Sequence, residues 1–122
     1  MDEPSVTVAD PRAGALAAAL FRSLSDPARV AILQQLATGE HRVRDLTDHV
    51  GLVQSTVSAH LACLRSCGLV TSRPEGRASL HSLAFPDELL ALLTAAENLL
   101  RATGYAVQLC PVHGTREPES PR

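Results

Sequence analysis

The sequence of 122 residues contains no lysine and no tryptophan, and only 2% of its residues are aromatic. With an apolar fraction of 45%, its core has to be aliphatic, built from leucine, valine, isoleucine and alanine. A core of this size is often extended by dimerisation. All 11 basic side chains are arginine, which can fork onto phosphates and guanine edges. The composition bias of GC-rich coding DNA accounts for the same preference.

Excess positive charge and long apolar runs are also missing. The formal net charge of -2 excludes binding of nucleic acid through bulk charge, so any DNA contact has to come from a local arginine cluster. No apolar run approaches the roughly 18 residues that cross a bilayer, and we expect no membrane partner. The stretch from Met1 to Asp10 is polar and acidic, unlike a secretory signal. We therefore expect a cytoplasmic protein with reduced thiols.

The chain has three cysteines, Cys63, Cys67 and Cys110. An odd number does not form a closed disulfide framework, and reduced thiols can bind metal instead. Cys63 and Cys67 are four residues apart, which puts them on one face of a helix. At 100° per residue, that face lies on the flank away from the side chains that would face DNA. The alternative is that both are small buried apolar residues.

The apolar periodicity predicts a mainly α-helical chain with a small β-hairpin. Helices are expected over residues 11–24, from the start signal Ser25-Asp26-Pro27 to Gly39, over 43–50, from about 52 to 67, and over 86–102. The turn at Gly51 makes the two central helices a helix-turn-helix. Strands over 69–73 and 77–83, with a turn at Pro74-Glu75-Gly76, form a wing.

Three segments follow from this pattern. Residues 1–10 are expected to be a disordered arm, residues 11–103 a winged helix-turn-helix domain, and residues 104–122 a flexible tail carrying Cys110. The last helix has more leucine than one solvent-facing helix should carry. We therefore expect a homodimer formed through the first and last helices.

Several motifs carry a resemblance to a known family. They are Ser25 to Arg29, the run from Gln54 to Leu61, Leu64, Gly68-Leu69-Val70, and the wing pair Gly76-Arg77. Over residues 12–103 they resemble the ArsR/SmtB family of metal-sensing repressors. The resemblance implies a dimeric winged helix-turn-helix protein that binds double-stranded operator DNA.

Within that family, the segment from Leu61 to Val70 resembles the CmtR type of sensor. The resemblance implies that Cys63, Cys67 and Cys110 bind Cd(II) or Pb(II), and that the metal releases a repressor which binds DNA when metal-free. Two other metal sites of the family are not matched. Residues 42–50 lack cysteine, and residues 87–101 lack histidine.

The identity of the effector stays open. Three thiolates suit soft Cd(II) or Pb(II), whereas Zn(II) prefers a fourth ligand, for which His60 and His113 are candidates. We interpret His60 as structural and His113 as uninvolved. As(III) also takes three thiolates, and Cys110 could form a disulfide with either other cysteine, so an arsenite- or thiol-redox-sensing repressor is the alternative. No nucleophile, base and acid set is present, and we expect no enzyme.

A DNA-binding surface is predicted at the start of the second helix of the helix-turn-helix and at the wing. Short polar side chains near that helix start can reach phosphates or base edges, and arginines flank the wing turn. The predicted contact residues are Gln54, Ser55, Thr56, Ser58, Arg73 and Arg77. Arg42 and Arg44 could add phosphate contacts. His81 stands where the family resemblance leads us to expect an aromatic residue, and we interpret it as structural or phosphate-facing.

Overall fold

A computed structural model describes residues 10–110 of the chain. The prediction of a disordered arm therefore lies almost wholly outside the described residues. The same is true of the tail beyond residue 110, including His113. The first part of the tail, residues 104–110, is described, and its predicted flexibility stays a prediction.

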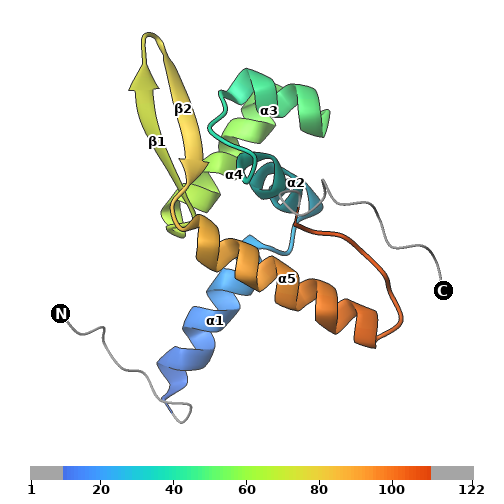
Figure 1. Cartoon of the computed structure of the whole chain (residues 1–122). Coiled ribbons are helices and arrows are strands. Elements are labelled where there is room, and N and C mark those ends of the chain that lie inside the picture. The colour runs from blue at the N-terminus through green and yellow to red at the C-terminus, as the bar shows by residue number, and fades with distance from the viewer. Residues whose placement is uncertain (1–9, 111–122) are drawn as a thin grey trace.

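The fold is a winged helix-turn-helix, as the sequence predicts. The elements in chain order are α1 Pro11–Ser23, α2 Pro27–Leu36, α3 Val43–Val50, α4 Gln54–Ser66, β1 Val70–Glu75, β2 Ala78–Leu83 and α5 Pro86–Ala102. Helices α3 and α4 form the helix-turn-helix. Figure 1 shows the hairpin projecting beside α3 and α4, with α1 and α5 on the other side of the molecule. Among the described residues, no helix is long and apolar enough to cross a membrane.

The starts of the first two helices follow from aspartate caps and proline. The side chain of Asp10 accepts a hydrogen bond from the amide of Arg12, and Asp26 accepts one of 2.7 Å from the amide of Ala28. Proline fills the first helical position after each cap, where its missing N–H costs nothing. Helix α3 ends at Gly51, whose φ of 71° suits glycine. These starts and stops set the spacing between α2, α3 and α4.

The core is aliphatic and centres on the helix-turn-helix. On α4, the apolar residues Val57, Leu61 and Leu64 recur at helical spacing and are buried. The whole buried apolar set is Ile32, Leu33, Leu36, Leu46, Val57, Leu61, Leu64, Val70, Leu83, Leu89, Leu93 and Cys110. Because these side chains hold α4 against α2 and α3, truncating a buried leucine to alanine should cost about 2–5 kcal/mol.

Strand β1 extends two residues further toward the turn than the sequence predicted, and the turn lies further along the chain. Strands β1 and β2 pair antiparallel from Val70↔Leu83 to Glu75↔Ala78. The prediction that Pro74 belongs to the turn was wrong, because Pro74 pairs with Ser79 inside the hairpin. A two-stranded ribbon tolerates proline since its amide nitrogen need not face the partner strand. The turn lies at Gly76, with φ 62°, and Arg77.

The base of the wing is tied to the loop before α3. His41 and His81 form an isolated antiparallel bridge, with backbone N–O distances of 3.0 and 2.8 Å. This bridge lies on the edge of β2 that does not face β1. It therefore fixes the wing relative to the helix-turn-helix.

Helices α1 and α5 expose large apolar side chains. Leu16 and Phe21 on α1 are 63% and 58% exposed, and Leu99 on α5 is 69% exposed. Exposure of this kind on a small protein is typical of a protein–protein contact. It lies on the two helices for which the sequence predicted dimerisation.

Candidate nucleic-acid interface and thiol groups

The start of α4 presents short polar side chains to solvent. Gln54, Ser55 and Ser58 are exposed, and Thr56 is half-buried beside them. Within residues 10–110, no side chain caps this helix start at Val53, so its first amide groups can donate hydrogen bonds to an external acceptor. Helix N-termini attract phosphate through these amides and the helix dipole. The predicted recognition residues therefore lie on one accessible helix end.

The wing arginine Arg73 is already engaged by a carboxylate. Its Nε and Nη2 atoms donate to Glu40, at 3.0 and 2.9 Å, in a bidentate pair. Arg73 holds the pKa of Glu40 below its ordinary value through this hydrogen bonding. A DNA phosphate that binds Arg73 has to displace Glu40. Sequence reasoning missed this pair because the partners are 33 residues apart.

A second ion pair joins the same two segments. Arg42 donates from Nε and Nη2 to Oε1 of Glu75, at 3.1 and 2.6 Å. This pairing raises the pKa of Arg42 above its ordinary value. By contrast, no ion pair of Arg77 is found in the part of the chain that the structure describes. Of the two predicted wing contacts, Arg77 is therefore the one without a carboxylate partner within residues 10–110.

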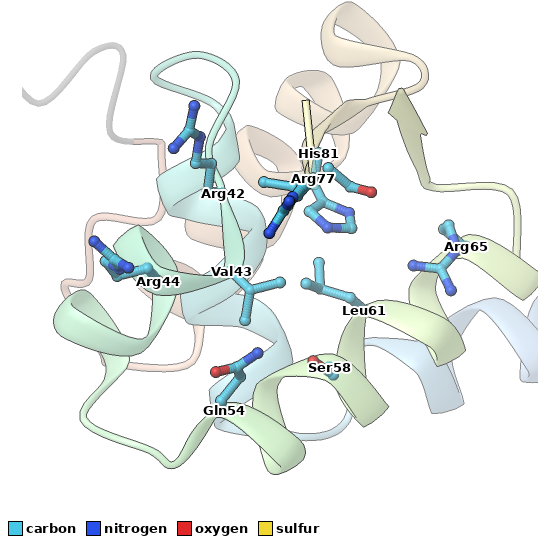
Figure 2. A pocket seen from close by; sticks show the side chains of 11 residues that line it. Arg42, Val43, Arg44, Gln54, Ser58, Leu61, Arg65, Arg77 and His81 are labelled. Carbon is cyan, nitrogen blue, oxygen red and sulfur yellow. The ribbon is translucent and has the colours of Figure 1, made fainter. Parts of the chain in front are cut away.

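A cavity of about 470 Å³ opens between α3, α4 and the wing. It brings together three of the predicted DNA contacts, Gln54, Ser58 and Arg77 (Figure 2). Ser55, Thr56 and Arg73 do not line it. Its full lining is Arg42, Val43, Arg44, Gln54, Ser58, Leu61, Arg65, Arg77, Ala78, Ser79 and His81. Its four arginines, of which Arg42 is paired with Glu75, form the kind of local positive cluster that DNA contact by a chain of net charge -2 would require.

The two cysteines of α4 lie at its C-terminal end. Cys63 is half-buried, and Cys67 is the exposed C-cap residue. The amide of Cys67 donates to the carbonyl of Cys63 at 3.1 Å, which keeps both on one helical turn. The Sγ atom of Cys67 lies 2.6 Å from Oγ of Ser23 at the end of α1. The exposed thiol of the pair therefore also contacts the first helix.

Cys110 is fully buried, and its thiol packs against α5. Its Sγ atom lies 3.0 Å from Oγ1 of Thr94 and 3.5 Å from the carbonyl of Leu90. The amides of Leu109 and Cys110 both donate to Oε2 of Glu97, the latter at 2.9 Å. Burial raises the pKa of Glu97, but these two amide donors outweigh it and leave the pKa below its ordinary value. Two adjacent amides and one carboxylate thus hold the tail in place.

A further contact fixes the tail on α2. Nε2 of Gln34 donates to the carbonyl of Leu109 at 3.1 Å. Among the described residues, no group of three His, Cys, Asp or Glu side chains is arranged to hold a metal ion. One protomer therefore offers the pair Cys63 and Cys67 and keeps Cys110 elsewhere. A site with all three thiolates requires the tail to leave α5, or a second chain to supply the third sulfur.

The histidine interpretations can be compared with the structure. Nδ1 of His60 lies 3.4 Å from Nη1 of Arg29, so His60 takes part in a polar contact between α4 and α2. His81 is only 5% exposed and lines the arginine cavity, so both of its expected roles remain compatible with its place.

Comparison with known proteins places these features in a family. The family described as "Bacterial regulatory protein, arsR family" matches residues 26–72. The chain is similar to the HTH-type transcriptional regulator CmtR of Mycobacterium tuberculosis, with 40% identity over 83% of this chain and 76% of CmtR. It is also similar to a probable mercury resistance operon repressor of Streptomyces lividans, with 38% identity over 66% and 68% of the two chains.

Solved structures show the same likeness. The NMR structure of the cadmium metal-sensor CMTR from Mycobacterium tuberculosis matches with a TM-score of 0.53 and 43% identity, over 62% of this chain and 82% of that one. The homodimeric winged helix-turn-helix DNA-binding domain Mb0332 from Mycobacterium bovis matches with a TM-score of 0.65 and 28% identity, over 79% and 91% of the chains.

Proposed function

The chain belongs to the arsR family of bacterial regulatory proteins, which makes it a transcriptional regulator, and we propose that it is a cytoplasmic, homodimeric repressor released from operator DNA by a soft metal ion. The observation that carries the metal response is the thiol pair of Cys63 and Cys67 on the recognition helix α4. A ligand bound there acts on the same helix whose other end faces DNA.

DNA binding is supported by the polar start of α4 and the arginine cavity. In a dimer, two such helices would enter successive major grooves of a near-palindromic operator. Arg77 and the backbone amides of the helix start would hold phosphates, while Gln54, Ser55, Thr56 and Ser58 reach base edges.

Dimerisation through α1 and α5 is supported by the apolar side chains that these helices expose. A related domain of the same fold, Mb0332, is described as homodimeric. Pairing of α1 and α5 with a second copy would bury Leu16, Phe21 and Leu99.

The proposed effector is Cd(II) or Pb(II), held by Cys63, Cys67 and Cys110. Thiolate sulfur is a soft ligand and suits these ions. The relatives named as a cadmium sensor and a mercury repressor support a soft metal in this family. Zn(II) fits three thiolates less well, because it prefers a fourth ligand.

If Cys110 serves a site in its own protomer, it has to leave its contacts with Thr94 and Glu97, and Leu109 has to leave Gln34. This release would also remove the tail from α2 and α5. The metal response therefore includes a change in how the tail packs, in cis or across the dimer. A coupling of about 1–3 kcal/mol between metal and DNA binding is typical of such allostery.

The experiment is a titration of the reduced full-length dimer with Cd(II), followed by ultraviolet thiolate-to-metal absorption and by operator anisotropy. We expect one Cd(II) for each set of three thiolates and a loss of operator affinity of about 5- to 150-fold. Cys63→Ser, Cys67→Ser and Cys110→Ser should each weaken both responses. Ser66→Ala, on the same turn of α4, is the matched control. Unchanged operator affinity with bound Cd(II) would contradict the proposal.

The exposed thiol of Cys67 favours a thiol-reactive effector as the alternative, either an oxidant or arsenite. Oxidation would join Cys110 to Cys63 or Cys67 with loss of two electrons and two protons to peroxide. Peroxide treatment without metal, followed by mass spectrometry, separates the two. A disulfide that releases DNA, in a protein with no affinity for Cd(II), would support redox sensing instead.

A further inference from the structure

The cavity between α3, α4 and the wing is more than a DNA-facing hollow, because a buried histidine lines it. Strand β2 supplies His81, whose ring projects into this space in Figure 2, with Arg65 and Arg77 directed to the same space. Leu61 forms its floor on α4. The lining thus combines fixed positive charge with one side chain that can gain a proton near neutral pH.

Within residues 10–110, one ring nitrogen of His81 lacks a hydrogen-bond partner. Its side chain is 5% exposed, and its Nδ1 atom has no hydrogen-bond partner among the residues that the structure describes. Buried polar atoms are nearly always paired, and this unpaired one belongs to a residue that lines the cavity, so a ligand there could complete the bond. Because Nδ1 donates when protonated, an anion is the ligand that it would bind most strongly.

We propose that this cavity is a seat for a phosphate group, in which protonated His81 binds the phosphate together with Arg65 and Arg77, so that operator binding takes up a proton. The inference rests on the proposed DNA-binding function and adds a regulatory variable to it. In the DNA complex the phosphate belongs to the operator backbone. Inorganic phosphate offers the same chemistry and serves as a second probe.

The charges around His81 explain why proton uptake follows phosphate binding. They are Arg65 on α4, Arg42 and Arg44 at the start of α3, and Arg77 in the wing turn, with the titratable His41 in the loop before α3. The carboxylates near them are engaged, since Glu75 pairs with Arg42 and Asp45 lies 3.7 Å from His41.

Burial and the neighbouring arginine charge lower the pKa of His81 in the free protein, so it is neutral there at neutral pH. A phosphate in the cavity offsets the arginine charge and accepts a hydrogen bond from the protonated ring. Both effects favour the protonated form. The bridge to His41 uses backbone atoms only, so it leaves both ring nitrogens of His81 free to change protonation state.

The test uses the full-length reduced dimer and an operator duplex selected from a random library. The NMR titration of the His81 imidazole is recorded for the free protein, with the duplex, and with inorganic phosphate against chloride at equal ionic strength. We expect the pKa of His81 to rise with the duplex. Operator affinity should increase as pH falls from about 7.5 to 5.5, by at most about tenfold per pH unit for one proton.

Variants separate His81 from the other histidines. His81→Phe should flatten the pH dependence of affinity, whereas His49→Gln, at an exposed position on α3, should keep it. If His81→Phe unfolds, the native titration alone decides. The proposal is wrong if the pKa of His81 is the same with and without the duplex, or if His81→Phe leaves the slope of operator affinity against pH unchanged.

The test separates free phosphate from the DNA backbone, and proton-linked binding from DNA binding itself. A pKa rise with both probes means that the seat accepts a free phosphate, and a rise with the duplex alone means that it needs the DNA backbone; both support the seat. Binding of operator with no proton uptake refutes the inference and leaves the repressor function intact. Failure to select any operator refutes the proposed function itself.

Discussion

Arg73 and Glu40 form a bidentate ion pair that joins the wing to the loop between α2 and α3. The pair places a carboxylate on an arginine that the sequence assigned to DNA. Free and DNA-bound states therefore compete for the same guanidinium. The competition can be measured.

Replacing Glu40 by Gln should strengthen DNA binding, because Arg73 no longer has to leave a carboxylate to bind a phosphate. We expect the slope of log affinity against log salt to steepen by about one unit, corresponding to one more phosphate contact. Anisotropy titrations over a salt series measure this slope. Glu88→Gln on α5 makes the same change in net charge away from the wing. An equal change in the salt slope of that variant would contradict the displacement of Glu40 by phosphate.

Weakening the contacts of the tail should expose Cys110. Glu97→Ala removes the carboxylate that accepts from the amides of Leu109 and Cys110. The rate of Cys110 alkylation, followed by mass spectrometry, should rise about tenfold or more, since buried thiols react only after local opening. Asp87→Asn, on the same helix, is the matched control. Equal rates in the parent and in Glu97→Ala would show that Glu97 does not hold the tail.

Acid should destabilise the protein through His81. Its pKa in the folded state lies below that of the unfolded chain, so the unfolded chain binds more protons between the two values. The free energy of unfolding should therefore fall as pH drops below about 6.5, by at most about 1.4 kcal/mol per pH unit.

His81→Phe should lose this part of the pH dependence, and His49→Gln should retain it. Urea unfolding at one fixed protein concentration measures both, because dimer stability varies with concentration. A parent protein whose stability rises with acid over this range would contradict the assignment.

Truncation of exposed apolar side chains should weaken dimerisation without unfolding the chain. Phe21→Ala on α1 and Leu99→Ala on α5 each remove an apolar side chain from the proposed contact. We expect the dimer dissociation constant, measured by sedimentation, to rise about tenfold or more, equivalent to about 1.4 kcal/mol. Val53→Ala, at an equally exposed apolar residue before α4, should leave it unchanged.

Local signals made most of the fold predictable. The aspartate and proline at the start of α2, glycine at the end of α3 and the stripe of Val57, Leu61 and Leu64 each lie within a few residues of what they determine. The burial of Ile32, by contrast, depends on which neighbours pack around α2. The wing turn was misplaced because Pro74 was taken for a turn residue.

The candidate site was less accessible to sequence reasoning. The polar start of α4 and the three cysteines are visible in the sequence, yet Glu40, Ser23 and Glu97 became relevant only through contacts between distant segments. No periodicity encodes such pairs. His81 carried a weak signal, since a histidine stood where an aromatic residue was expected.

The bridge between His41 and His81, with the ion pairs on either side of it, fastens the wing to the helix-turn-helix at three points. In the free protein these contacts restrain the wing against the helix-turn-helix, so we expect an effector to change the angle between two copies of this unit more readily than the angle within it. An effector would then control DNA binding by changing the orientation of one helix-turn-helix and wing relative to the other. In a symmetric dimer, a small tilt at α1 and α5 would change the distance between the two α4 helices. That distance would no longer match the spacing of the two operator half-sites, and operator affinity would fall.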